Sequence, residues 1–186
     1  MPMGSRKGSS FERAISKVIS LWWSQGKDPN CLYRTHGSGS MHKRRANVHT
    51  GDIGPLTPAG MGFPLHCELK HYRNLNWSSL LSAAPSKFVL FQWFEKASQE
   101  ADGGHPRLIP CLIVKVNHMK TAFIVDKKLY EALEFFFKLR LTIEPRSGLL
   151  CMFSLNNQLF ALDFERVMRD ITPSTFMRIY ADWYKN

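Results

Sequence analysis

The stretch Phe63–Lys70, with the sequence FPLHCELK, decides how the rest of the chain is interpreted. Apolar side chains occupy its odd positions, and its even positions carry proline, histidine, glutamate and lysine, an alternation that places the two sets on opposite faces of a β-strand. We therefore predict a strand with one buried face, from whose other face Glu68 and Lys70 project together. Pro64 cannot donate a ladder hydrogen bond, so we expect it near the start of the strand or at an edge of the sheet.

Helical and strand periodicities extend outward from this stretch. The first predicted helix runs from the capping box Ser9–Glu12 to the Gln25-Gly26 pair. Further helices are predicted over residues 76–82, over residues 86–101 with a stop at Gly103 and Gly104, over residues 130–138, and over residues 164–183 with a break at Pro173. Strands are predicted over residues 108–116, 121–125 and 149–155. This mixture predicts an α/β fold whose sheet is covered by helices.

The size and composition of the chain favour a single domain with an appended tail. Its 186 residues, 44% of them hydrophobic, are enough for one well-buried core. The sequence lacks an apolar run of the roughly 18 residues that would suggest a membrane span, and its start lacks the apolar segment of a secretory signal. We therefore expect a soluble protein with no membrane partner. Its four cysteines are widely scattered, without zinc-ligand spacing, and are expected to be reduced and mostly buried.

Positive charge is concentrated near the N-terminus. The formal net charge is +10 and the sequence pI about 9.7, which favours a polyanionic partner. Residues 36–47 (HGSGSMHKRRAN) form a basic loop rich in glycine and serine, which suits close approach to a sugar-phosphate backbone. The predicted DNA contacts in this loop are Ser38, Ser40, Lys43, Arg44 and Arg45. The alternative is a flexible loop that only aids solubility.

Three residues form the candidate catalytic group. Asp52 precedes a Pro/Gly-rich connection that leads into the strand of Glu68 and Lys70. If its segment pairs with that strand, two carboxylates and one ammonium converge at a sheet edge. Mg²⁺ prefers such hard oxygen ligands, and the carbonyl of Leu69 could add another; Mn²⁺ is expected to substitute. The ion would polarise a scissile phosphate and acidify a water. Lys70 could orient that water, accept its proton or neutralise charge on the phosphate.

An Asp followed by a strand with Glu-x-Lys resembles the PD-(D/E)xK nuclease superfamily. Further segments resemble its Holliday-junction resolvase branch, and a phage-type recombination nuclease is one kind of protein that this resemblance includes. The segments that carry the resemblance are, in order, Gly8-Ser9-Ser10-Phe11-Glu12-Arg13, Arg34 with Gly37-Ser38-Gly39-Ser40, Asp52, Glu68-Leu69-Lys70, the helix from Phe91-Gln92-Trp93 to Ala101, and the strand Leu112-Ile113-Val114-Lys115. The resemblance implies a restriction-endonuclease-like core, and it adds Glu12 to the catalytic residues and Arg34 and Gln92 to the DNA contacts. Gly51 replaces the usual proline before the Asp, and residues after Val125 have no placed counterpart.

The resemblance also suggests how the chain is divided. We expect a nuclease core over residues 1–128 and a C-terminal extension over residues 129–186 that packs on the core and contributes to a dimer interface. A four-way junction has two strands to cut, so a resolvase needs two active sites, and a homodimer supplies them. Phe135, Phe136 and Phe137 cannot all face one core from a single helix, which makes them candidate dimer contacts. The alternative is that the monomer buries all three.

Each candidate residue also has a structural interpretation. Glu12 could only close the capping box and favour the helix dipole. Glu68 and Lys70 could be a solvated surface pair, and Asp52 a plain turn residue. Gln92, with Lys96 and Gln99 on its helical face, could contact water alone. The histidines lie on no recognisable ligand spacing and most are expected at the surface, although His66 shares the face of Glu68.

The sequence thus predicts a Mg²⁺-dependent DNA endonuclease that hydrolyses phosphodiester bonds and selects branched over ordinary duplex DNA. Its expected location is the cytoplasm of a bacterial cell, or of the host cell for a phage-encoded enzyme. One alternative is a non-catalytic DNA-binding or packaging protein that retains the nuclease fold. A second alternative is a basic adaptor that binds an acidic protein, in which case the pattern of Asp, Glu and Lys would be coincidental.

Overall fold

The structure is a computed structural model that describes residues 4–35, 51–75, 88–103, 106–141, 151–155 and 158–185. The helices are α1 (Gly4–Trp23), α2 (Val89–Asp102), α3 (Lys127–Leu141), α4 (Phe164–Asp170) and α5 (Pro173–Lys185), with a 3-10 turn at Pro58–Gly60. The strands are β1 (Leu32–Arg34), β2 (Ile53–Pro55), β3 (Leu65–Tyr72), β4 (Ile109–Val116), β5 (Ala122–Asp126), β6 (Cys151–Leu155) and β7 (Leu159–Asp163).

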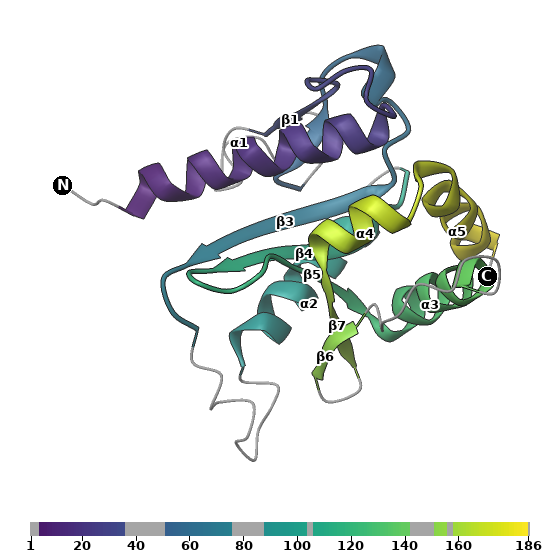
Figure 1. The fold of residues 1–186 in the computed structure, drawn as a ribbon. Coiled ribbons are helices and arrows are strands. Elements are labelled where there is room, and N and C mark those ends of the chain that lie inside the picture. Colours follow the sequence, from purple (N-terminus) through teal and green to yellow (C-terminus); the bar gives the residue numbers. More distant parts are fainter. Residues whose placement is uncertain are drawn as a thin grey trace.

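A mixed five-stranded sheet with the order β3-β4-β5-β7-β6 forms the centre of the molecule. The β3–β4 pair is parallel and the other three pairs are antiparallel. Helices α1, α4 and α5 lie on one face of the sheet and α2 lies on the other (Figure 1). This confirms the predicted α/β class, and the arrangement is compatible with a restriction-endonuclease-like core.

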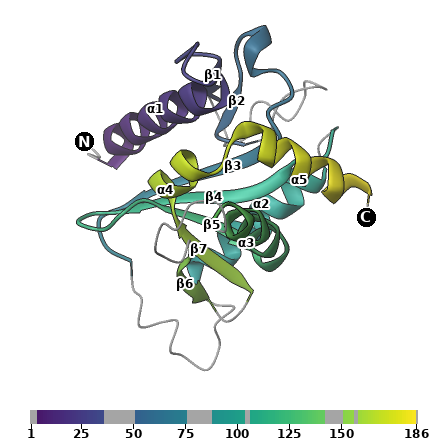
Figure 2. The same cartoon turned by 45° about the vertical axis from the view of Figure 1, so that its right-hand side comes forward.

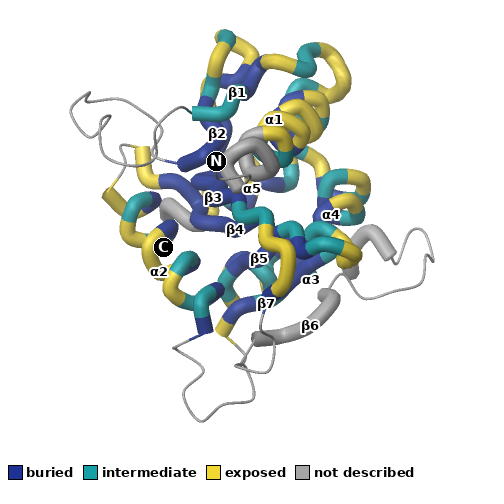
Figure 3. Tube along the Cα trace, turned by 90° about the vertical axis from the view of Figure 1, so that its left-hand side faces the viewer, coloured by how far each residue is buried: buried dark blue, intermediate teal, exposed yellow. Residues whose placement is uncertain are grey.

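The strand β3 occupies an edge of the sheet and begins one residue after Pro64, as predicted from the missing N–H of proline. Its odd residues Leu65, Cys67 and Leu69 join the main hydrophobic core beneath α1. The prediction of only one buried face is wrong, because α2 covers the other face as well. His66 and Glu68, which lie on that face, are 0% and 6% exposed, and Figure 3 shows β3 and β4 as a buried band.

The helix α2 matches its predicted pattern. Leu90, Phe94, Ala97 and Ala101 are its buried residues, as the helical spacing indicates, and Gly103 caps its C-terminus. Leu90, Phe94 and Ala97 pack in a second hydrophobic cluster with the side chains of β4 and β5 that point away from α1. The predicted helix over residues 76–82 and the predicted start of the following helix at residues 86–87 fall outside the described residues.

The beginning of α1 differs from its prediction. The helix starts at Gly4, so Ser9 and Ser10 lie inside it and the predicted capping box is wrong. Glu12 is consequently an interior residue of the helix and cannot cap its start. The predicted end is confirmed, because Gln25 and Gly26 have φ values of 54° and 83°. The N–H of Gly26 donates to the carbonyl oxygen of Leu21 at 2.7 Å, which closes the last turn.

A short antiparallel pair, β1 with β2, lies beside α1 and the outer edge of β3 (Figure 2). Its register pairs Arg34 with Ile53, which places Asp52 directly before the first paired residue of β2. The connection that follows crosses closely over β1: a Cβ on Gly60 would lie 2.1 Å from the carbonyl oxygen of Cys31. The glycine therefore permits an approach that any other side chain would block.

The C-terminal third completes both the sheet and the core. The predicted helix and strand are present as α3 and β6, and Pro173 separates α4 from α5 as expected. The strand β7 was not predicted, although it pairs with both β5 and β6. Phe164 and Phe176 from α4 and α5 join the same core as the odd residues of β3.

Candidate active site

Two hydrogen bonds attach Asp52 to the outer edge of β3, and a third joins it to Thr35 beside β1. Its N–H donates to the carbonyl oxygen of Cys67 at 2.8 Å, and the N–H of Leu69 donates to its Oδ2 at 2.8 Å. On the other side, the N–H of Thr35 donates to the carbonyl oxygen of Asp52 at 3.0 Å. The predicted approach of this segment to the Glu-x-Lys strand is thus confirmed. Asp52 is only 7% exposed, which distinguishes it from an ordinary solvated turn residue.

Gly51 explains how Asp52 comes so close to the strand. A Cβ at this position would lie 2.9 Å from the carbonyl oxygen and 3.1 Å from the nitrogen of Cys67. A larger residue would force the segment away from β3 and lengthen the hydrogen bond of Asp52 to Cys67. The glycine in place of the usual proline is therefore suited to the close packing seen in this chain.

Glu68 and Lys70 project from β3 toward α2. The ammonium of Lys70 donates to Oε1 of Glu68 and lies 5.8 Å from the ring centroid of Trp93. Trp93 in turn stacks on Tyr72, with centroids 4.9 Å apart. Glu68 is too deeply buried for the alternative of a solvated surface pair.

The electrostatics of the site reflect crowding of acidic groups. Burial raises the pKa of Asp52, the nearby charge of Glu68 adds to the effect, and the N–H of Leu69 and the charge of Lys70 oppose it, so that the pKa reaches about 6. Burial alone would lower the pKa of Lys70, but its hydrogen bond to Glu68 and the charges of Glu68 and Asp52 leave that pKa raised. Lys70 therefore remains an ammonium at neutral pH in the metal-free protein.

Glu12 and Arg34 form an ion pair that joins α1 to β1. The charge of Glu12 also contributes to the raised pKa of Asp52, so this carboxylate lies within electrostatic reach of the site. Both side chains are partly exposed, at 19% for Glu12 and 30% for Arg34. The structure thus brings Glu12 toward the predicted catalytic group with Arg34 as its partner.

Of the other predicted DNA contacts, only Gln92 lies in the described part of the chain. Gln92 is exposed on α2, next to Trp93. Ser38, Ser40, Lys43, Arg44 and Arg45 lie outside the described residues.

Asp52 and Glu68 have the donor chemistry that a hard divalent cation requires. Both are buried carboxylates; burial and, after it, the nearby charge of Glu68 raise the pKa of Asp52, and a bound cation would offset both effects. The N–H of Leu69 points to Asp52, so its carbonyl is directed to the same outer edge of β3, because the two groups of one strand residue point the same way. The residues present therefore fit a Mg²⁺ or Mn²⁺ ion.

Sequence analysis missed two residues beside this group, Trp93 and Glu100. Both lie on one flank of α2, with Lys96 between them, at the helical spacing i, i+3 and i+7. That spacing is visible in the sequence. Nothing in it indicates that this flank faces Glu68, which follows only from the packing of α2 against β3.

The fold and this group define an α/β protein with an acidic residue at a sheet edge and Glu-x-Lys on the edge strand, the arrangement expected of PD-(D/E)xK nucleases. The family model described as "Phage putative PDDEXK endonuclease" matches residues 4–147, and the chain belongs to this family. The resemblance to the superfamily is thereby confirmed, and DNA is the substrate class that such a family implies. No curated protein and no solved structure matches the chain. No helix in the described part of the chain is long and apolar enough to cross a membrane.

Proposed function

We propose that this protein is a metal-dependent DNA endonuclease whose active site consists of Asp52, Glu68 and Lys70. The observation that carries the proposal is the anchoring of the Asp52 carboxylate to the N–H of Leu69 beside buried Glu68. Two buried carboxylates whose charges repel one another are costly unless a cation balances them. Such a cost is typical of functional sites and not of sites that serve stability.

The carboxylates of Asp52 and Glu68 and the carbonyl of Leu69 would hold Mg²⁺, with Mn²⁺ as a substitute. When bound, the ion supplies Lewis-acid polarisation of the phosphate and a more acidic water. Lys70 remains charged because of Glu68, which disfavours its use as a proton acceptor. Its ammonium instead neutralises the negative charge that builds on the phosphate during hydrolysis.

The ion pair of Glu12 and Arg34 gives these two residues a joint role beside the metal site. Arg34 contacts a DNA phosphate, and Glu12 holds the guanidinium in place through their ion pair. Gln92 and the basic loop with Ser38, Ser40, Lys43, Arg44 and Arg45 complete the DNA contacts in this proposal. The net charge of +10 supports it, since an excess of positive charge attracts the phosphates of DNA.

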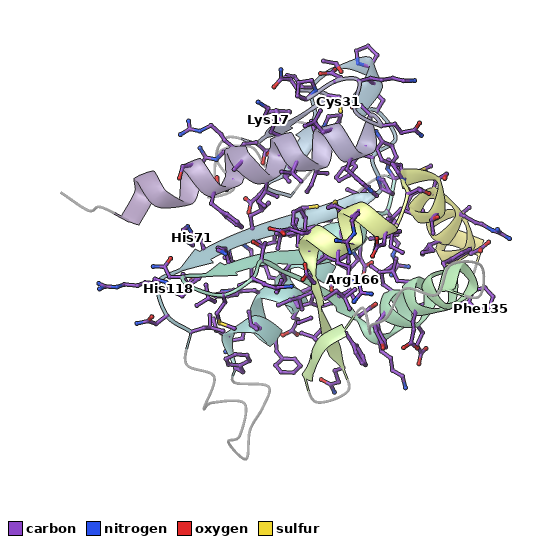
Figure 4. All side chains as sticks on the ribbon, viewed as in Figure 1. Lys17, Cys31, His71, His118, Phe135 and Arg166 are labelled. Carbon is purple, nitrogen blue, oxygen red and sulfur yellow. The ribbon has the colours of Figure 1, made fainter. Side chains whose placement is uncertain are left out.

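We further propose that the protein is a homodimer that cuts branched DNA in the manner of a Holliday-junction resolvase. It acts in the cytoplasm of a bacterial cell, which is the host cell if a phage encodes the protein. The division into a core over residues 1–128 and an extension over residues 129–186 belongs to this proposal. Phe135 supports it, because its side chain is 62% exposed and projects outward from α3 (Figure 4). Phe136 packs against the main core, and the side chain of Phe137 lies outside the described residues.

Nicking of supercoiled plasmid by the purified protein tests the nuclease proposal. We expect nicking with Mg²⁺ or Mn²⁺ and none with excess EDTA. Asp52→Asn keeps an oxygen for the N–H of Leu69 but removes the charge, so it should stop nicking and leave DNA binding intact. DNA binding by the wild type without any metal-dependent nicking would favour the non-catalytic alternative.

Sedimentation and four-way-junction cleavage test the finer proposal. We expect a dimer at micromolar concentration, and Phe135→Ser should shift it toward monomer because a large apolar contact is removed. A wild-type monomer that nicks duplex DNA and ignores junctions would leave the nuclease proposal standing and refute the resolvase version.

A further inference from the structure

A second group of metal-ligating side chains lies on the α2 side of Glu68. One donor atom each from His66, Glu68 and Glu100 lies within 4.8 Å of the other two. His66 comes two residues before Glu68 on β3, so both side chains point to the same face. Glu100 reaches them from the C-terminal half of α2. Asp52 and the carbonyl of Leu69, which belong to the proposed Mg²⁺ site, are at the outer edge of β3 and are not members of this group.

The burial of the group favours a ligand over a solvated cluster. His66 is 0% and Glu68 6% exposed, whereas Glu100 is partly exposed, so the group lies beneath α2 with its access from the Glu100 side. The separation between Nε2 of His66 and Oε2 of Glu100 is 3.6 Å. That is longer than a good hydrogen bond. It is close to the spacing of two ligands on one cation with metal–ligand bonds of about 2.0–2.2 Å.

The donor set selects the kind of cation. One imidazole nitrogen with two carboxylates suits a borderline ion such as Zn²⁺, whereas Mg²⁺ prefers oxygen ligands alone. We propose that His66, Glu68 and Glu100 form a transition-metal site, represented by Zn²⁺, that is separate from the Asp52–Glu68 site and shares Glu68 with it. The proposal goes beyond the nuclease function, and metal binding here would stand even if the protein cleaved no DNA.

Two lysine ammonium groups lie near the carboxylates of this group. The ammonium of Lys96 lies 3.7 Å from Oε1 of Glu100, but its side chain is 57% exposed, so solvent weakens the pair. Lys70 is hydrogen-bonded to Oε1 of Glu68, which leaves the other oxygen of that carboxylate for an ion. A cation held by His66 and Glu100 would also connect β3 to α2, and should therefore stabilise the fold by binding the native state alone.

Zinc titration by calorimetry, with millimolar Mg²⁺ present throughout, tests the proposal on the untagged full chain. We expect one tight Zn²⁺ per chain. Glu100→Gln should weaken Zn²⁺ binding by about ten-fold or more, since it removes a charged ligand without adding bulk. The matched control is Glu95→Gln, an exposed position on the same helix that loses the same charge and should bind Zn²⁺ like the wild type. Equal affinity of both variants would overturn the site.

Two further measurements identify the ligands. Asp52→Asn should weaken Mg²⁺ binding and still bind one Zn²⁺ per chain, because Asp52 is outside the group and supplies no Zn²⁺ ligand. Substitution of Co²⁺ should give the absorption of an N/O-ligated ion. A thiolate charge-transfer band would instead place the metal on the free cysteines Cys31, Cys67 or Cys111 and refute the proposal. His66→Asn should lower Co²⁺ affinity as well, but Glu100→Gln decides the outcome if this buried change impairs folding.

Discussion

The two faces of β3 are buried to a similar extent and have opposite chemistry. On the face beneath α1, Leu65 and Cys67 belong to the hydrophobic cluster that also holds apolar side chains of α1, α3, α4 and α5 and of the neighbouring strands. On the face beneath α2, His66 and Glu68 are equally inaccessible, yet both are polar. Burying apolar side chains stabilises the fold, whereas burying a carboxylate costs free energy unless a partner balances its charge. The comparison teaches that burial on β3 serves two purposes: the apolar face stabilises the fold, whereas the two buried polar side chains carry a cost in stability and are the ones that the proposed sites use.

The largest expected effect comes from the α2 face. Glu68→Gln should lower the nicking rate by about a thousand-fold or more, because a metal-binding charge and the partner of Lys70 are lost together. Measured Tm should fall little, if at all. Glu95→Gln is the control, since it removes the same charge from an exposed position of α2. Retained cleavage in Glu68→Gln would remove the functional contrast between the two faces.

The second prediction concerns the α1 face. Leu65→Ala should lower the free energy of unfolding by about 2–5 kcal/mol, since it leaves a cavity in the main core. At a temperature where the variant is still folded, its nicking rate should remain within a few-fold of the wild type. Urea unfolding gives the first quantity and the plasmid assay the second. A variant that folds normally and has lost activity would show that the two faces are not separable.

The third prediction uses the pKa of Asp52 in the metal-free protein. Folding raises this pKa from 3.8 to about 6, so the neutral carboxyl contributes stability that is fully present below about pH 4 and is lost as the pH rises through 6. Asp52→Asn avoids that loss and should be more stable than the wild type by about 1–3 kcal/mol at pH 8 in EDTA. The difference should vanish near pH 4. Thermal melts of both proteins from pH 4 to 8 measure it, and a wild type that stays the more stable at pH 8 would contradict it.

A small effect on stability is also expected at the Glu12–Arg34 pair. Both side chains are partly exposed, so Arg34→Gln should change the free energy of unfolding by about 1 kcal/mol or less. Its effect on DNA binding should be larger, with weaker affinity and a salt dependence reduced by about one phosphate contact. Binding isotherms at several salt concentrations provide the measurement. An unchanged salt slope would mean that Arg34 serves only to join β1 to α1.

Much of this fold follows from local patterns. The alternation of Phe63–Lys70 determined a strand and placed Glu68 and Lys70 on one face, because side-chain direction in a strand depends only on backbone geometry. The spacing of Leu90, Phe94 and Ala97 determined the buried side of α2 for the same reason. The ordered set of segments, from Gly8–Arg13 through Asp52 and Glu68-Leu69-Lys70 to Leu112–Lys115, was sufficient to indicate the nuclease superfamily.

Other features depended on which elements meet in space. The sequence could not show that α2 covers the polar face of β3 or that Glu100 joins His66 and Glu68. It also gave no sign that β7 lies between β5 and β6. These outcomes depend on the packing of segments far apart in the chain, whose free energy comes from surfaces that exist only once the elements are assembled. Local periodicity therefore determined the faces of each element, and tertiary packing decided what each face meets.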